Sequence, residues 1–216
     1  MRYAGSRNFT GRPVPGYDAP ECVLVQKAAE ALKAAQDDLK SMGLSLKVYD
    51  CYRPTMAVAA FVDWSKEPDD RDSKHRYYPN LPKTKLFPDY IATRSGHSRG
   101  STLDVTIVPL ASTPSEVDLF KPEVCTSGDR TDNSLDMGTS FDCFDPKANI
   151  DTQGLTAKQQ ENRDLLLEVM RRQGFKNYPK EFWHYTFEPE PYPSTYFDFP
   201  ILPRTPDGTP SSGDPE

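Results

Sequence analysis

Two of the three histidines in this chain of 216 residues stand close to carboxylates in the sequence. His97 and Asp104 form a His-x6-Asp pattern, and Glu181 and His184 form a Glu-x-x-His pattern. Imidazole nitrogens and carboxylate oxygens both bind zinc, and a catalytic zinc uses three protein ligands and one water. His97, Asp104 and His184 would supply such a set, so the patterns predict a catalytic zinc site.

Two further residues would act beside that metal. Glu181 lies one short step from the ligands, so its carboxylate would take a proton from the metal-bound water. Arg53 stands at a Tyr-Arg-Pro turn, where its charge would stabilise an oxyanion. The third histidine, His75, is expected at the surface, because a fourth ligand would close the metal to water. The His-Glu-x-x-His pattern of the commonest zinc proteases does not occur in the sequence.

Each of these residues, taken alone, also fits a structural role. A histidine near a strand end is commonly a hydrogen-bonding group, a buried aspartate can cap a loop, and a surface arginine can pair with an acid. The metal hypothesis rests on the combination, because both histidine segments carry an acidic residue.

Hydrophobic periodicity predicts the elements that would position these side chains. Alternation of apolar and polar positions, or aromatic enrichment, predicts strands over 44–50, 102–108 and 182–187. A short strand followed by a turn is also expected within 1–17. Helices and strands mix without a regular β-α-β repeat, which predicts the α+β class.

Three helices are predicted from helical spacing and from the signals at their ends. The first would be capped by Asp18 with Glu21 and would end at Gly43. The second would begin at Pro54. The third would be capped by Thr156 with Gln159 and would end at Gly174. The segments 66–91 and 110–150 are polar, so we expect two long loops. Loops of this length in a compact domain are commonly functional.

The composition predicts one acidic globular domain over 1–203, followed by a disordered tail over 204–216. The chain has 26 basic and 32 acidic residues, and this excess of acid excludes the basic face that nucleic-acid binders need. No apolar run approaches the roughly 18–20 residues of a membrane span. No apolar leader follows Met1, so we expect that the chain has no signal peptide or has already lost one. The sequence leaves the oligomeric state open.

Four cysteines bear on the compartment. They show no Cys-x-x-Cys spacing, which disfavours a zinc knuckle or a thioredoxin-like motif. Three pairings are possible, of which the nearest in sequence joins Cys22 to Cys51 and Cys125 to Cys143. Each bond would add about 2–4 kcal/mol and would place the chain in the periplasm or outside the cell. Four buried free thiols would instead fit a cytoplasmic protein.

Several segments occur in the order found in one known family. They are Asn-Phe-Thr-Gly-Arg-Pro at 8–13, Tyr-Arg-Pro at 52–54, Ser-Gly-His at 95–97 with Asp104, Asp-Met-Gly-Thr-Ser-Phe-Asp at 136–142, Glu-Phe-Trp-His at 181–184 and Tyr-Phe-Asp-Phe-Pro at 196–200. Together they resemble the VanX-type D-alanyl-D-alanine dipeptidases, within the hedgehog/D,D-peptidase superfamily. The resemblance covers nearly the whole domain, from about residue 3 to 200.

The resemblance implies a role for each matching residue. His97, Asp104 and His184 would bind one Zn²⁺ per chain. Glu181 would be the general base that later protonates the leaving amine, and Arg53 would stabilise the tetrahedral intermediate. Three more residues would contact the substrate: Asp142, which would pair with its ammonium group, together with Ser95 and Tyr3.

The resemblance also implies a fold and an activity. The fold would be an antiparallel sheet flanked by helices around a small enclosed cavity, and the activity would be zinc-dependent hydrolysis of D-Ala-D-Ala and similar D,D-dipeptides. One alternative is a D,D- or L,D-carboxypeptidase acting on cell-wall stem peptides, which would need a cleft open at the ammonium side. Another is a non-catalytic zinc-binding domain that binds a peptide or partner protein, but Glu181 and Arg53 would then serve no purpose.

A dipeptidase must reject longer peptides. It therefore needs a closed pocket with a fixed anion for the ammonium and a fixed cation or dipole for the carboxylate. The two long loops could form the walls of such a pocket, and an oxidised Cys125–Cys143 pair would hold Asp142 in place. Wall recycling, use of D-Ala-D-Ala as a nutrient and glycopeptide resistance would all need this same chemistry.

Overall fold

The computed structural model describes residues 1–111, 124–127 and 133–204. Its helices and strands are, in chain order, α1 (Gln26–Lys40), β1 (Leu44–Asp50), α2 (Thr55–Lys66), α3 (Arg71–Tyr77), β2 (Thr102–Pro109), α4 (Ala157–Arg172), β3 (Phe175–Asn177) and β4 (His184–Phe187). This mixture confirms the α+β class. Parts of the predicted loop over 110–150, and all of the predicted disordered tail beyond Arg204, lie outside the described residues.

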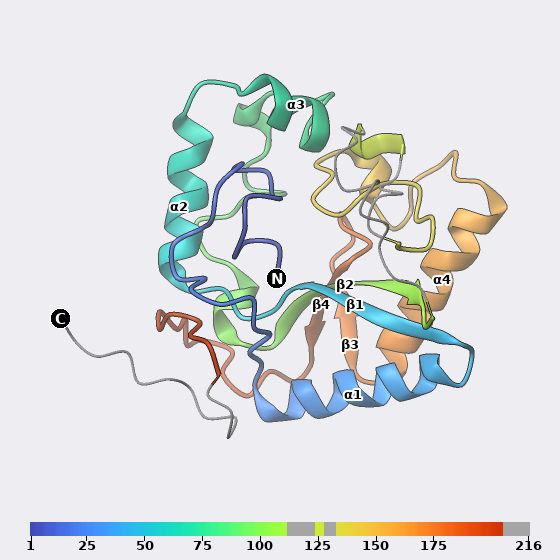
Figure 1. Cartoon of the computed structure of the whole chain (residues 1–216). Helices are drawn as coiled ribbons and strands as arrows, with labels where there is room; N and C mark the ends of the chain where they lie inside the picture. Colours follow the sequence, from blue (N-terminus) through green and yellow to red (C-terminus); the bar gives the residue numbers. More distant parts are fainter. Residues whose placement is uncertain (112–123, 128–132, 205–216) are drawn as a thin grey trace.

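A single antiparallel sheet organises the described part of the chain. Its strand order is β1-β2-β4-β3, so strands that are distant in the sequence lie side by side at its centre (Figure 1). The register places Asp50 opposite Asp104 and Asp104 opposite His184. Directly opposed residues point to the same face of a sheet, so three polar side chains from three strands share one face.

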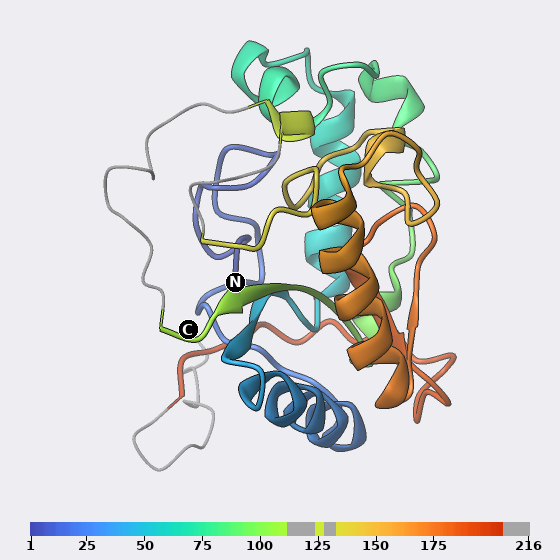
Figure 2. The ribbon, with the colours of Figure 1, turned by 90° about the vertical axis from the view of Figure 1, so that its right-hand side faces the viewer.

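The helices cover the sheet unequally. Helix α1 runs along β1 on one face and contacts α4, which also packs on β3 and β2 (Figure 2). Helices α2 and α3 lie beyond the other face together with the N-terminal segment (Figure 1). Phe9 joins this second layer, with its ring 4.7 Å from that of Phe61, 4.9 Å from that of Trp64 and 5.1 Å from that of Phe144. The Asn-Phe-Thr-Gly motif is therefore a packing element.

The prediction of a strand within 1–17 was wrong. The segment is a series of turns, apart from an isolated bridge between Tyr17 and Ile201. The buried Asn8 explains this, because its side-chain amide donates to the carbonyls of Gly5 and Arg12 and accepts from the amide of Thr10. Asparagine side chains that satisfy nearby backbone groups in this way favour turns over strands.

The first helix begins later than predicted, at Gln26, and neither Asp18 nor Glu21 caps it. The preceding residues are extended because their backbone groups are used elsewhere. The Val23 carbonyl accepts from the amide of Tyr52, and the amide of Val25 donates to the Gly100 carbonyl. These tertiary hydrogen bonds outweigh the local helix signal.

The sequence patterns did not predict two short elements of the fold. Helix α3 lies inside the predicted loop over 66–91 and is capped by Asp70, which accepts from the Ser73 amide at 2.7 Å. Strand β3 is only three residues long, too short for a periodic signal. The predicted strands over 44–50 and 102–108 are confirmed, whereas the one over 182–187 begins at His184. The capping box of Thr156 and Gln159 on α4 is present as predicted.

Both nearest-in-sequence disulfides are present, Cys22–Cys51 and Cys125–Cys143. The first fastens the extended segment before α1 to the residue after β1, and the second joins Cys125 to the neighbour of Asp142. Among the described residues, the helices lack the length and apolar character needed to cross a membrane.

Candidate active site

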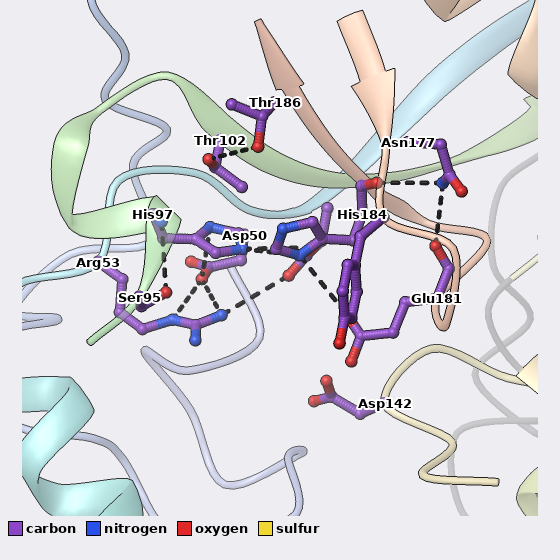
Figure 3. A network of polar contacts seen from close by, with 12 residues as sticks. Asp50, Arg53, Ser95, His97, Thr102, Asp142, Asn177, Glu181, His184 and Thr186 are labelled. Carbon is purple, nitrogen blue, oxygen red and sulfur yellow. Dashed lines mark hydrogen bonds and ion pairs between the residues drawn. The ribbon is translucent and has the colours of Figure 1, made fainter. Parts of the chain in front are cut away.

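Three potential metal ligands, His97, Asp104 and His184, meet at the two central strands of the sheet. Figure 3 shows two of them, His97 and His184, side by side. Asp104 lies on β2, His184 is the first residue of β4, and His97 lies in the short 3₁₀ turn Gly96–Arg99 that leads into β2. Gly100 ends this turn with a left-handed φ of 75°, a conformation that favours glycine. This turn packs against β2, the strand that follows it, and so places His97 beside that strand.

The three ligand atoms face one another at short distances. His97 Nε2 lies 3.4 Å from Asp104 Oδ1 and 3.3 Å from His184 Nδ1, and His184 Nδ1 lies 3.1 Å from Asp104 Oδ1. Asp104 Oδ1 is buried and accepts no hydrogen bond from the described residues. A buried carboxylate oxygen of this kind is costly unless a cation satisfies it. The donor set and its convergence therefore fit a bound divalent metal.

The surroundings of His97 leave its Nε2 atom suited to bind a metal. Its other nitrogen, Nδ1, lies 2.7 Å from the carbonyl oxygen of Cys51, to which it donates its proton. A metal-bound histidine typically donates its second N–H to such a partner, which sets the tautomer and the ring orientation. Burial lowers the pKa of His184, which favours the neutral imidazole that a metal can bind.

Glu181 lies in the turn before β4, with its carboxylate 3.4 Å from His184 Nδ1. Asn177 fixes this turn, because its side-chain amide donates to the Glu181 carbonyl at 3.0 Å. Burial raises the pKa of Glu181 well above its usual range, and the nearby charges of Asp104 and Asp142 raise it further. A carboxyl group shifted in this direction can accept and return a proton near neutral pH.

Arg53 is held as a rigid cation beside the ligands. Its Nε and Nη2 atoms both bind Asp50 Oδ2 at 2.9 Å, and Nη2 lies 3.7 Å from Asp104 Oδ2. The guanidinium also lies over the rings of Tyr3 and Phe61, about 5 Å from each centroid. Both bonds to Asp50 use the Nε–Nη2 edge of the guanidinium, so the N–H groups of Nη1 can bind a substrate oxygen.

Asp142 places a further carboxylate across the space from the histidines (Figure 3). It is buried, and the Tyr3 hydroxyl donates to both of its oxygens at 3.1 and 3.0 Å. Its backbone has a left-handed φ of 59°, and its neighbour Cys143 is bonded to Cys125. Burial and the charge of Asp104 raise the pKa of Asp142, which a bound cationic group would counteract.

All eight predicted site residues line one cavity of about 250 Å³. They are Tyr3, Arg53, Ser95, His97, Asp104, Asp142, Glu181 and His184. The Ser95 hydroxyl accepts from the His97 amide at 3.3 Å, so this serine helps to shape the histidine turn. As expected, His75 is exposed; it lies on α3 and does not line the cavity.

Sequence reasoning missed Asp50, which connects several of these groups. Besides Arg53, it accepts from the Tyr17 hydroxyl at 2.7 Å, and its Oδ2 lies 3.5 Å from His97 Nδ1. Asp50 is fully buried and stands opposite Asp104 in the sheet. The sequence did hold a clue, because an acidic residue ends the predicted strand over 44–50, three positions before Arg53. No local pattern, however, predicts which cation this carboxylate binds.

Comparisons with known proteins agree with one another. A model of the Peptidase_M15 family, described as D-ala-D-ala dipeptidase, matches residues 1–121 and 123–202. A D-alanyl-D-alanine dipeptidase of Streptomyces coelicolor is 39% identical over 201 residues, 93% of this chain and 90% of that protein. One of Enterococcus faecium is 35% identical over the same shares, and one of Escherichia coli is 28% identical over 86% of this chain and 76% of its own length.

Proposed function

This chain belongs to the D-Ala-D-Ala dipeptidases of the Peptidase_M15 family, and we propose from that membership that it hydrolyses D-alanyl-D-alanine and similar D,D-dipeptides in the cavity described above. One observation carries the proposal. The three ligands, an acid–base candidate, a fixed cation and a separate carboxylate all line a single small cavity. Its volume of about 250 Å³ is below the roughly 300–1,000 Å³ typical of ligand pockets, which favours a very small substrate.

His97, Asp104 and His184 would hold the metal. Two imidazole nitrogens and one carboxylate oxygen suit zinc, and we propose one zinc ion per chain. When bound there, a divalent metal supplies polarisation of the scissile carbonyl and acidifies a water molecule.

The side chains around the metal would carry the proton transfers and balance the charges. Glu181 takes a proton from the attacking water, and the new C–O bond forms as that water adds to the carbonyl carbon. Arg53 stabilises the negative charge on the carbonyl oxygen. Glu181 then returns the proton to the amide nitrogen as the C–N bond breaks, which releases two D-alanine molecules. Asp142, oriented by Tyr3, pairs with the substrate ammonium throughout.

Release of D-alanine tests this function directly. We expect chelator-sensitive cleavage of D-Ala-D-Ala, but not of N-acetyl-D-Ala-D-Ala, whose blocked amine cannot pair with Asp142, nor of L-Ala-L-Ala. Cleavage of the acetylated compound would favour the carboxypeptidase alternative. If zinc-loaded protein cleaves none of the three, the dipeptidase proposal is wrong and a non-catalytic binding domain becomes the better interpretation.

We also propose a periplasmic or secreted location. Two disulfides support it, since such bonds persist mainly in oxidising compartments. Fractionation of the producing cells, with activity measured in each fraction, tests this proposal.

A further inference from the structure

A second arginine reaches the cavity besides Arg53. Arg94 directly precedes Ser95, lines the cavity wall and is exposed. Its guanidinium carbon lies 4.3 Å from the centre of the Tyr196 ring. Within the described residues it forms no ion pair with a carboxylate, so the positive charge of this cavity-lining residue is not neutralised by a neighbour.

The other charged side chains around the cavity either form ion pairs or already have a proposed role in the reaction. Arg53 is bound by Asp50, and Asp89 at the cavity wall forms an ion pair with Lys180. Asp142 suits the ammonium end of a dipeptide, and a carboxylate of the substrate at the same place would be repelled by it. A zwitterionic dipeptide therefore needs a cation at the end away from Asp142.

The ring under Arg94 is itself fixed in place. The Tyr196 hydroxyl accepts from Arg99 Nη1 at 3.3 Å, and Arg99 forms a two-pronged ion pair with Glu190 at 2.7 Å on each side. Stacking on an aromatic face leaves the N–H edge of a guanidinium available, and that edge matches the geometry of a carboxylate. Tyr196 therefore orients Arg94 without using its hydrogen-bond donors.

We propose that Arg94, oriented by the ring of Tyr196, binds the C-terminal carboxylate of the substrate and makes the enzyme specific for peptides with a free C-terminus. This inference rests on the proposed dipeptidase function. It assigns to Arg94 the cation that a dipeptide pocket requires for the substrate carboxylate, in the same cavity as the ammonium-binding Asp142. The contact is charge-assisted and of the two-pronged kind that arginine forms best.

Steady-state kinetics on two substrates test the proposal. D-Ala-D-Ala carries the carboxylate, and D-Ala-D-alaninamide replaces it with a neutral amide. We expect Arg94→Gln to lower kcat/KM for D-Ala-D-Ala by about tenfold or more, as loss of a hydrogen bond to a charged group predicts, with little change for the amide. Most of the loss should appear in KM. Arg94→Lys should recover part of it, and Tyr196→Leu should act in the same direction.

Arg71→Gln is the matched control, because Arg71 is an exposed arginine on α3 that does not line the cavity. It should leave both substrates unaffected. An equal loss on both substrates in Arg94→Gln, or no loss on either, contradicts the carboxylate assignment while the dipeptidase function stands. If the wild-type chain with metal fails to cleave D-Ala-D-Ala, the proposed function is wrong and this inference falls with it.

Discussion

Asp104 stands directly opposite His184 in the antiparallel pairing of β2 with β4, and their facing Oδ1 and Nδ1 atoms lie 3.1 Å apart. The site thus depends on sheet register. A shift of one residue in either strand would turn one of these side chains to the other face and destroy the ligand set. The hydrophobic partners along β2, such as the buried Leu103 and Val105, hold that register by packing into the core.

Metal removal should lower stability as well as activity. A ligand that binds only the folded state stabilises it, and three converging donors without a cation leave Asp104 unsatisfied. We expect chelation to lower the unfolding temperature, measured by differential scanning calorimetry, and His97→Ala to lose the metal in elemental analysis. Equal unfolding temperatures with and without chelator would argue against a metal at this site.

Glu181→Ala should abolish turnover and leave the metal bound. General acid–base groups contribute about 10²- to 10⁴-fold to a rate, so kcat should fall at least a hundredfold. The measurement pairs D-alanine release with metal content of the same sample. A variant with near wild-type kcat would overturn the assignment of Glu181 as the base.

Asp50→Asn should slow the reaction through Arg53. The substitution preserves shape but weakens the bonds that hold the guanidinium. Changes to groups that orient an active-site residue commonly cost about 10- to 100-fold, and we expect the loss in kcat with the metal retained. Tyr17→Phe removes only the Oδ1 contact and serves as the milder comparison. A change in KM alone would show that Asp50 does not act through Arg53.

Loss of the Cys125–Cys143 disulfide should weaken substrate binding more than metal binding. The bond adjoins Asp142, whose left-handed backbone we expect it to hold, but none of the three proposed metal ligands. The double variant Cys125→Ala with Cys143→Ala should raise KM for D-Ala-D-Ala, while elemental analysis finds the metal content unchanged. An unaltered KM would mean that Tyr3 and the surrounding packing hold Asp142 without the disulfide.

Arg163→Met should destabilise the fold. This buried arginine on α4 donates to the carbonyls of Met137, Lys147 and Asn149, and so fastens both ends of the loop that carries Asp142. Burial lowers its pKa to about 10, so it stays charged at neutral pH. Each carbonyl left without a partner costs about 1–3 kcal/mol, so we expect at least about 3 kcal/mol less stability in urea unfolding. A loss below 1 kcal/mol would show that water replaces the arginine.

Local sequence patterns were informative where an element is long or strongly capped. The alternation over 44–50, the run over 102–108 and the capping box at Thr156 each correspond to an observed element. They failed where other hydrogen bonds, tertiary in one segment and from a local side chain in another, replaced those of the predicted element. The segment before Gln26 is extended because Val23 and Val25 bond to distant backbone, and the segment around Asn8 turns because its amide satisfies the backbone.

The chemical inventory of the site could be predicted from the sequence, because ligand types and spacings are local properties. His-x6-Asp and Glu-x-x-His identified the residues that the structure brings into one cavity. The contacts between these residues could not be predicted in this way, because they form only in the folded chain. Tyr3 binds Asp142 across 139 positions, Asp50 restrains Arg53 beside Asp104, and Arg94 lies on Tyr196. Such pairs depend on strand register and on loops closing over the sheet, and these arise from packing of the whole chain.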